Sequence, residues 1–278
     1  MPTSTSTKVL SRPFLKWAGG KTQLIEQYKP YFPKTYTNYY EPFLGGGAVF
    51  FSLQPKQAFL SDINGELINT YRCVRDEVEA LIILLQEHQL KHNKDYYYEM
   101  RAGGGDSKLE RAARFIYLNK TCFNGLYREN SKGHFNVPMG KYKNPTICNA
   151  ELLRLVSTTL NNSRAKIKKV TFKEVINYAK NSDDFVYFDP PYYPISATSN
   201  FTAYSRTDFN EDDQIQLRNT FAELASRGVK VMLSNSDCPF VRDIYQGFNI
   251  HTIKAFRSIN ADVNKRGKIT EVLVTSNY

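Results

Sequence analysis

The sequence predicts an α/β fold in which two α/β portions flank an insert of helices and loops. Strand-like apolar segments alternate with helical patterns before residue 66 and again after residue 169. The residues between these portions show helical spacing followed by a loop-rich stretch. Glycines or acidic residues follow several expected strands, and ligands bind at the carboxyl ends of parallel strands in such folds.

The first portion reads as a βαβ unit. Residues 22–31 have helical spacing and residues 36–41 are typical of a strand. Residues 48–53 begin another helix, and the strand expected over residues 58–61 ends at Asp62. Both expected strands therefore lead into turns that are rich in glycine or polar residues.

The insert differs in character from the portions around it. Residues 66–89 and 108–119 show helical apolar spacing, and a loop of three glycines lies between them at residues 103–105. Residues 125–142 are rich in glycine, asparagine and aromatic residues, which predicts a loop or a hairpin.

The last portion returns to alternation. Residues 185–188 form a short apolar run between Asp184 and Pro190, which predicts a buried strand. After a polar loop through residue 207, Asn210 is a good N-cap for a helix that runs to about Ser226. Gly228 ends that helix, residues 229–233 form the next strand, and two β-rich segments complete the chain.

Charge and composition limit the classes of function. The 278 residues carry a formal net charge of +10, which favours a polyanionic partner. Basic residues outnumber acidic ones in residues 115–145 and in residues 254–268. The longest apolar run spans only residues 80–85, so we expect a cytoplasmic protein with no membrane span, preceded by a disordered tail at residues 1–8. The four cysteines and four histidines lack ligand spacing, so we expect no metal.

Two glycine clusters need separate interpretation. The first, residues 18–22 (AGGKT), has Leu15 where a phosphate-binding P-loop needs glycine, so it does not predict a nucleotide triphosphatase. The second, residues 45–47, follows a strand, but Phe50 stands where a dinucleotide motif has glycine. Asp62 ends the next strand, where a carboxylate accepts hydrogen bonds from ribose hydroxyls. Together these features suggest a ligand that contains adenosine.

The most specific local signal is residues 189–192 (DPPY), directly after the buried strand. Pro190 and Pro191 fix the backbone, which holds the Asp189 carboxylate and the Pro190 carbonyl as two acceptors at the strand end. Two acceptors suit an exocyclic amine, because each takes one N–H and the nitrogen lone pair stays free. Tyr192 is placed to stack on an attached aromatic ring.

Five separated motifs now carry a resemblance. They are residues 14–21 (FLKWAGGK), 41–47 (EPFLGGG), 61–64 (SDIN), 189–192 (DPPY) and 233–237 (LSNSD). Their order resembles that of Dam-type DNA adenine-N6 methyltransferases of the alpha class, over about residues 10–275. In the insert, residues 124–128 (NGLYR) and 135–142 (FNVPMGKY) resemble the hairpin of members that read GATC.

The resemblance implies a Rossmann-like mixed-sheet fold and transfer of a methyl group from S-adenosylmethionine to adenine N6 in duplex DNA, with base flipping. It divides the chain into a catalytic domain at residues 9–66 and 161–278 and a target-recognition domain at residues 67–160. It also implies that residues 200–204 (NFTAY) belong to a loop that closes near the flipped base.

The resemblance assigns site residues by position. The catalytic residues are Asp189, Pro190 and Tyr192. The cofactor contacts are Trp17, Lys21, Phe43, Gly45, Asp62, Phe172 and Asp189. The DNA contacts are Lys16, Phe123, Asn124, Leu126, Arg128, Asn136, Pro138 and Tyr142. Phe123 stands where such enzymes can carry a tyrosine, so stacking persists there while a hydroxyl contact is lost.

Two alternatives stay open at this point. The same chemistry serves RNA or free amides in other enzymes with similar tetrapeptides, and a binding protein can be built on an inactive methyltransferase scaffold. The sequence also leaves open whether the protein works alone or beside a restriction nuclease.

Overall fold

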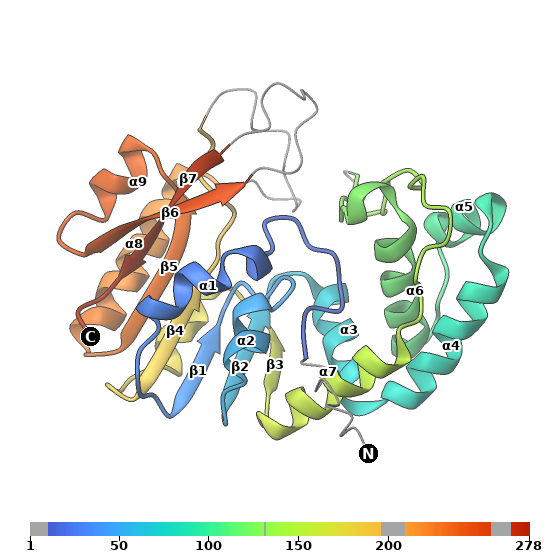
Figure 1. The fold of residues 1–278 in the computed structure, drawn as a ribbon, viewed down its shortest axis with the longest axis horizontal. Helices are drawn as coiled ribbons and strands as arrows, with labels where there is room; N and C mark the ends of the chain where they lie inside the picture. Colours follow the sequence, from blue (N-terminus) through green and yellow to red (C-terminus); the bar gives the residue numbers. More distant parts are fainter. Residues whose placement is uncertain (1–10, 131, 196–208, 257–267) are drawn as a thin grey trace, which may run out of the picture.

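The computed structural model describes residues 11–130, 132–195, 209–256 and 268–278. Within them, seven strands form one sheet in the order β3-β2-β1-β4-β5-β7-β6 (Figure 1). β1 to β5 are parallel, and β7 runs antiparallel to β5 and β6. The strands are β1 Asn38–Glu41, β2 Ala58–Asp62, β3 Lys166–Lys169, β4 Asp184–Phe188, β5 Lys230–Ser236, β6 Asn249–Phe256 and β7 Lys268–Thr275. This is the expected Rossmann-like mixed sheet.

Helices cover both faces of this sheet. The α-helices are α1 Ile25–Tyr28, α2 Ala48–Leu53, α3 Gly65–Asp76, α4 Val78–Lys91, α5 Lys94–Ala102, α6 Lys108–Thr121, α7 Ala150–Asn162, α8 Glu211–Ser226 and α9 Pro239–Ile244. The 3-10 turns are η1 Lys21–Gln23, η2 Lys29–Tyr31, η3 Phe123–Gly125 and η4 Phe172–Asn177. None of the helices in the described ranges is long and apolar enough to cross a membrane.

The apolar run of the central strand β4, residues 185–188, is explained by the packing of both its faces. Phe185 and Tyr187 pack into the core shared with α2 and α3, whereas Val186 and Phe188 pack into the core shared with α8 and α9. All five residues of the strand are buried because both faces are covered. The strand therefore holds the residues that follow it in a fixed position.

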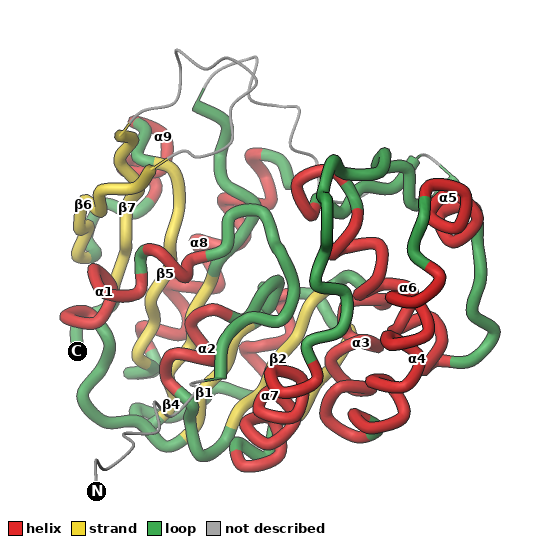
Figure 2. Tube along the Cα trace, turned by 45° about the vertical axis from the view of Figure 1, so that its right-hand side comes forward, coloured by secondary structure: helices red, strands yellow, loops and turns green. Residues whose placement is uncertain are grey.

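The insert stands beside β3 and shares a core with the sheet. α3 contacts β2 and β3 on one side and α6 and α7 on the other. α4, α5 and α6 form the outer part, and the segment after α6 lies at its upper end, on the side toward which β1, β2 and β4 point (Figures 1 and 2). One continuous buried cluster joins these helices to β1 and β2.

Several expected elements are confirmed almost residue for residue. α2, β2, α6 and β4 match their expected ranges, and Asn210 caps α8 through a capping box with Asp213. β5 extends to Ser236, three residues beyond the expected end. Two isolated bridges, Cys122 with Met139 and Glu129 with Phe135, support the expected hairpin after α6.

Other expectations were wrong. Residues 22–31 are not one helix but two 3-10 turns around the short α1, because Pro30 lacks an N–H and clashes with a preceding carbonyl in an α-helix. Residues 66–89 form two helices that break at Glu77, where φ is −135°. The break lets α3 pack on the sheet while α4 packs on α6. The sequence analysis assigned no helix to α5, α7 or α9.

Candidate active site

The carboxylate of Asp189 lies directly after β4, in contact with two polar side chains. Lys21 Nζ is 2.9 Å from Asp189 Oδ1, and Ser234 Oγ donates to the same oxygen at 2.9 Å. The Lys21 side chain is only 4% exposed, so this ion pair is largely shielded from solvent. The other oxygen, Oδ2, accepts no hydrogen bond from the described residues and is available to a ligand.

Tyr192 is fixed at both ends of its side chain. Its ring lies 4.5 Å from Lys21 Nζ, and its hydroxyl donates to Glu271 Oε2 at 2.7 Å. The backbone before it is also held, because Gln214 Nε2 donates to the Pro191 carbonyl at 2.9 Å. Asp189, Lys21 and Tyr192 thus form one cluster, as their shared assignment to the site predicts.

The second glycine cluster packs against Trp17 and the end of β2. Gly45 and Gly47 have φ values of 45° and 68°, which favour glycine. A Cβ at Gly45 would lie 2.8 Å from the Trp17 indole, so only glycine fits this close approach. Asp62 binds the turn, because its carboxylate accepts from the Gly45 N–H at 3.1 Å and the Asn64 N–H at 2.9 Å.

An aromatic cluster lies on the other side of the turn. Phe43 stacks on Phe172 with ring centroids 5.4 Å apart, and Phe209 contacts both rings edge-on. Phe172 begins η4 just after β3. The structure therefore brings the predicted cofactor residues together at the ends of β1, β2 and β4.

Glu41 ends β1 inside this site and had no role in the sequence analysis. Its side chain is 2% exposed, and Oε2 accepts from the Tyr39 hydroxyl at 2.8 Å and from the Phe50 N–H at 3.2 Å. Burial raises the pKa of Glu41 to about 8, and the charges of Asp189 and Asp62 add to this increase.

The predicted DNA contacts gather around η3 and the hairpin that follows it. Lys16 Nζ lies 4.0 Å from the centroid of the Tyr142 ring, and its backbone forms two hydrogen bonds with the Asn119 side chain. Arg128 Nε donates to Asn136 Oδ1 at 2.8 Å across the hairpin. These pairs hold two exposed basic groups, Arg128 on the insert and Lys16 beside it.

The remaining predicted contacts lie in the same segment. Phe123 is 49% exposed, and its N–H donates to the Pro138 carbonyl at 2.9 Å. Asn124 is exposed with φ of 55°, a conformation that asparagine tolerates. Leu126 is half-buried and packs against the main core, so part of its surface serves packing.

Comparison with known proteins shows the family of the chain. Residues 17–259 match the family described as D12 class N6 adenine-specific DNA methyltransferase. The chain belongs to this family. It is therefore an adenine-specific DNA methyltransferase, whose substrate is DNA, and the family implies the use of S-adenosylmethionine in general. The alternatives of an RNA substrate and of an inactive binding scaffold are set aside.

Relatives cover nearly the whole methyltransferase. It is 48% identical over 275 residues to the Type II methyltransferase M1.LlaDCHI of Lactococcus lactis subsp. cremoris, covering 97% of this chain and 96% of the relative. It is 44% identical to the Type II methyltransferase M.MjaIII of Methanocaldococcus jannaschii, covering 96% and 99%. It is 36% identical to the DNA adenine methylase of Escherichia coli K12, covering 95% and 94%.

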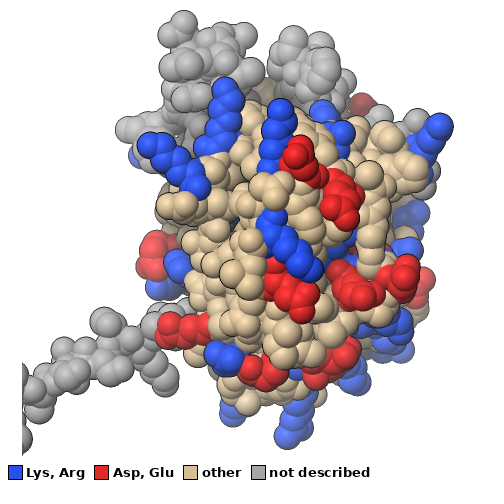
Figure 3. Space-filling model, turned by 90° about the vertical axis from the view of Figure 1, so that its right-hand side faces the viewer, with Lys and Arg blue, Asp and Glu red and all other residues tan. Residues whose placement is uncertain are grey.

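The charge on the insert side of the methyltransferase is uneven. Basic side chains project along the upper part of this face, and acidic side chains concentrate in its middle and lower parts, with further basic ones among them (Figure 3). The hairpin contributes Lys132, Lys141 and Lys143 as exposed basic residues. A polyanion is thus attracted to the upper end of the insert.

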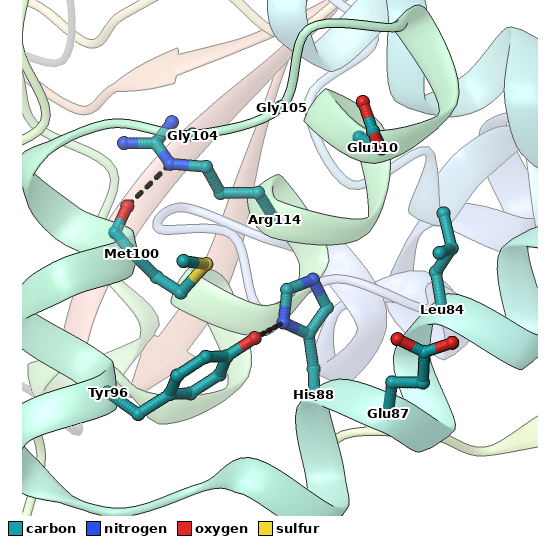
Figure 4. A pocket seen from close by; sticks show the side chains of 9 residues that line it. All are labelled: Leu84, Glu87, His88, Tyr96, Met100, Gly104, Gly105, Glu110 and Arg114. Atoms are coloured by element: carbon teal, nitrogen blue, oxygen red, sulfur yellow. Dashed lines mark hydrogen bonds between the residues drawn. The ribbon is translucent and has the colours of Figure 1, made fainter.

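A separate cavity of about 190 Å³ lies within the insert of the methyltransferase, between α4, α5 and α6. His88 Nδ1 is 2.7 Å from the Tyr96 hydroxyl there, and Arg114 Nε donates to the Met100 carbonyl at 2.5 Å (Figure 4). None of the predicted site residues lines this cavity, so it does not belong to the site at the strand ends.

Some sequence predictions fall outside the described residues of the methyltransferase. These are the tail at residues 1–8, the loop at residues 200–204 and most of the second basic segment, residues 257–267. Among described residues, Ser234 and Glu41 adjoin the candidate site but were not predicted from the sequence. Both follow a general signal that was present, namely a polar side chain near the carboxyl end of a central strand.

The buried carboxyl of Glu41 should make folding stability depend on pH. A glutamate in an unfolded chain has a pKa of about 4.3, so the native protein, with its pKa of about 8, binds this proton more tightly. The stabilisation is complete below pH 4 or so and is lost as the pH rises toward 8. Between pH 5.5 and 7.5, we expect the free energy of unfolding of the unsubstituted protein to fall by about 1 kcal/mol per pH unit relative to that of Glu41→Gln. Urea unfolding at three pH values measures this, and parallel curves for the two proteins would contradict it.

Proposed function

We propose that this enzyme transfers the methyl group of S-adenosylmethionine to adenine N6 of GATC in duplex DNA, after the adenine is flipped out of the helix. The carrying observation is the exposed Arg128–Asn136 pair, which lies in a hairpin whose sequence resembles that of GATC readers. In this proposal, residues 67–160 act as the target-recognition domain, and residues 9–66 and 161–278 act as the catalytic domain.

The arrangement at the strand ends fits the proposed cofactor. Asp62, whose carboxylate also binds the Gly45 turn, is an acceptor for ribose hydroxyls. The Phe43–Phe172 pair offers apolar surface to an adenine ring. Trp17, Lys21 and Asp189 complete the contacts. When bound, S-adenosylmethionine supplies an electrophilic methyl group.

The residues after β4 would orient the target amine. Asp189 Oδ2 and the Pro190 carbonyl are acceptors for its two N–H groups, which leaves the nitrogen lone pair free to react. Both acceptors favour the positive charge that develops on the nitrogen. Tyr192, held by Glu271, supplies a rigid ring on which the adenine stacks.

The proposal includes base flipping because the Asp189 carboxylate is largely buried at the end of β4. An adenine N6 within the base stack is out of reach of enzymes that do chemistry on a base. Asp189 is only 21% exposed at the end of β4, so the base has to come to the carboxylate. The proposal places the enzyme in the cytoplasm, with the DNA, and beside a restriction nuclease, since two relatives are named as Type II methyltransferases.

The guanine of GATC is assigned to Arg128. Its Nε is bonded to Asn136, and its two terminal nitrogens have no partner among the described residues. Two parallel N–H groups match guanine O6 and N7 in the major groove. Asn136 thus orients the guanidinium through Nε and leaves its two terminal nitrogens free to bind the guanine.

Replacing Arg128 tests this assignment. We expect Arg128→Ala to reduce discrimination between GATC and a site with the guanine changed by about 1–3 kcal/mol. Arg128→Lys keeps the charge but lacks the fork, so it should lose discrimination similarly while binding DNA more tightly than the alanine variant. If Arg128 contacts a phosphate instead, relative preference stays constant and the salt dependence of binding weakens by about one charge. Methylation rates on a panel of duplexes decide between the two roles.

The proposal as a whole has a direct test. Plasmid DNA is incubated with the purified protein and S-adenosylmethionine, then digested with nucleases that are blocked or activated by adenine methylation at GATC. We expect protection from the first kind and cleavage by the second. Methylated adenine at other sequences, with GATC unmodified, would reject the specificity but leave the adenine methyltransferase activity intact.

A further inference from the structure

Three carboxyl groups line neighbouring strand ends in the active site, and their environments differ. Asp62 ends β2, Glu41 ends β1 and Asp189 follows β4. Asp189 is paired with Lys21, and Asp62 accepts two backbone N–H groups on its two oxygens. Glu41 has no cation among the described residues, and both of its donors reach the same oxygen.

The surroundings of Glu41 therefore oppose a negative charge in the free protein. Its side chain is 2% exposed, and Asp62 and Asp189 both act on it with like charge. The other titratable groups that face it are the phenols of Tyr39, Tyr71 and Tyr187, whose pKa values burial raises well above the usual one. All three phenols are neutral at physiological pH, and Lys21 is occupied by Asp189.

A cationic ligand at this site would favour the negative charge on Glu41 that the free protein opposes. S-adenosylmethionine carries positive charge on its sulfonium and its ammonium group. A positive charge placed near a buried carboxyl favours its ionised form. The site already holds a hydrogen-bond donor from Tyr39 and one from Phe50 for the carboxylate that would form.

We propose that Glu41 is protonated in the free enzyme and releases its proton to solvent when the cofactor binds, so that the new carboxylate stabilises the positive charge of the cofactor. The O–H bond of Glu41 breaks, the proton passes to buffer, and no other group changes. This inference rests on the cofactor of the proposed function. It makes Glu41 a positioning residue, and it predicts tighter cofactor binding as the pH rises from 6 to 8.

The proton can be counted by calorimetry. The full-length protein is titrated with S-adenosylmethionine at pH 7 in buffers that differ in ionisation enthalpy. The slope of the observed heat against that enthalpy gives the number of protons released. We expect roughly 0.5–0.9 proton per site at pH 7, and almost none above pH 9.5, where Glu41 is already ionised. At pH values below the pKa of Glu41, the dissociation constant for S-adenosylmethionine should fall by up to about tenfold for each unit by which the pH rises.

Two variants and a control identify the group. Glu41→Gln keeps the shape and an acceptor oxygen, and should abolish both the proton release and the pH dependence of affinity. Tyr39→Phe removes a hydrogen bond that lowers the pKa of Glu41, so the pH midpoint of release should rise by about 0.5–1 unit. Glu151→Gln, at an exposed glutamate in the first turn of α7, should behave as the parent.

The outcomes separate the two proposals. If S-adenosylmethionine gives no binding heat in any buffer, the cofactor assignment in the proposed function fails. If it binds with equal heats in all buffers, or if Glu41→Gln still releases the proton, the inference about Glu41 is overturned and the proposed function stands. An unchanged midpoint in Tyr39→Phe would likewise assign the proton to another group.

Discussion

We expect Asp189→Ala to slow methyl transfer in a single turnover by at least about 10²–10³-fold, the scale for deleting one electrostatic stabiliser. In the proposed function the carboxylate faces a nitrogen that becomes positively charged, so its effect should be greater in the transition state than in the ground state. The substitution also leaves Lys21 buried without its partner, which adds to the loss through cofactor placement. Specific DNA binding should persist, because the hairpin is untouched.

Rapid-quench measurement on a GATC duplex at saturating cofactor, with DNA affinity by anisotropy, tests this expectation. Asp189→Asn keeps the size of the side chain and an acceptor for Ser234, so it isolates the loss of charge. Asp183→Asn is the matched control, because Asp183 is exposed and lies just before the first residue of β4. Near-parental turnover of Asp189→Ala would remove the residue from the mechanism. Normal turnover with lost DNA affinity would make its role structural.

The second large effect is expected at Asp62. Asp62→Ala should weaken S-adenosylmethionine binding by about 1.5–3 kcal/mol, the cost of losing hydrogen bonds to a charged group. The structure adds a reason, because the Gly45 and Asn64 N–H groups lose their acceptor and the turn is released. Asp62→Asn retains one acceptor oxygen, so its affinity for S-adenosylmethionine should lie between that of the parent protein and that of Asp62→Ala. Calorimetry with cofactor alone measures the effect, and DNA affinity without cofactor should not change. A variant that binds cofactor like the parent would refute the assignment.

Much of the fold could be predicted because its signals are local. The apolar run of β4 is bounded by Asp184 and Pro190, and the capping box of α8 lies within four residues of chain. α7 carried equally local signals, an Asn149 N-cap and buried residues at helical spacing, so its omission was avoidable. α5 was harder, because only Tyr97 of its nine residues is buried.

The motifs predict the candidate site as a set of residues, but they do not predict the contacts between those residues. Each motif points to its own residue, yet Lys21 and Asp189 are far apart in the chain and meet only in the folded protein, where η1 packs on α2. The bond from Tyr192 to Glu271 depends in the same way on β7 joining the sheet next to β5. Such pairs follow from tertiary packing, which no spacing in the sequence encodes.

Lys16 and Trp17 are adjacent in the chain, and the proposed function assigns them to different ligands. Lys16 lies against Tyr142 of the proposed DNA surface, while Trp17 covers the Gly45 turn. Planar peptide geometry keeps their Cα atoms about 3.8 Å apart and allows rotation only about φ and ψ. The Asn119 side chain forms hydrogen bonds with both the N–H and the carbonyl of Lys16, which restricts the backbone at this residue. One peptide unit therefore joins the residue that contacts the hairpin to the residue that covers the Gly45 turn, and the two proposed ligands would contact neighbouring residues of the same backbone.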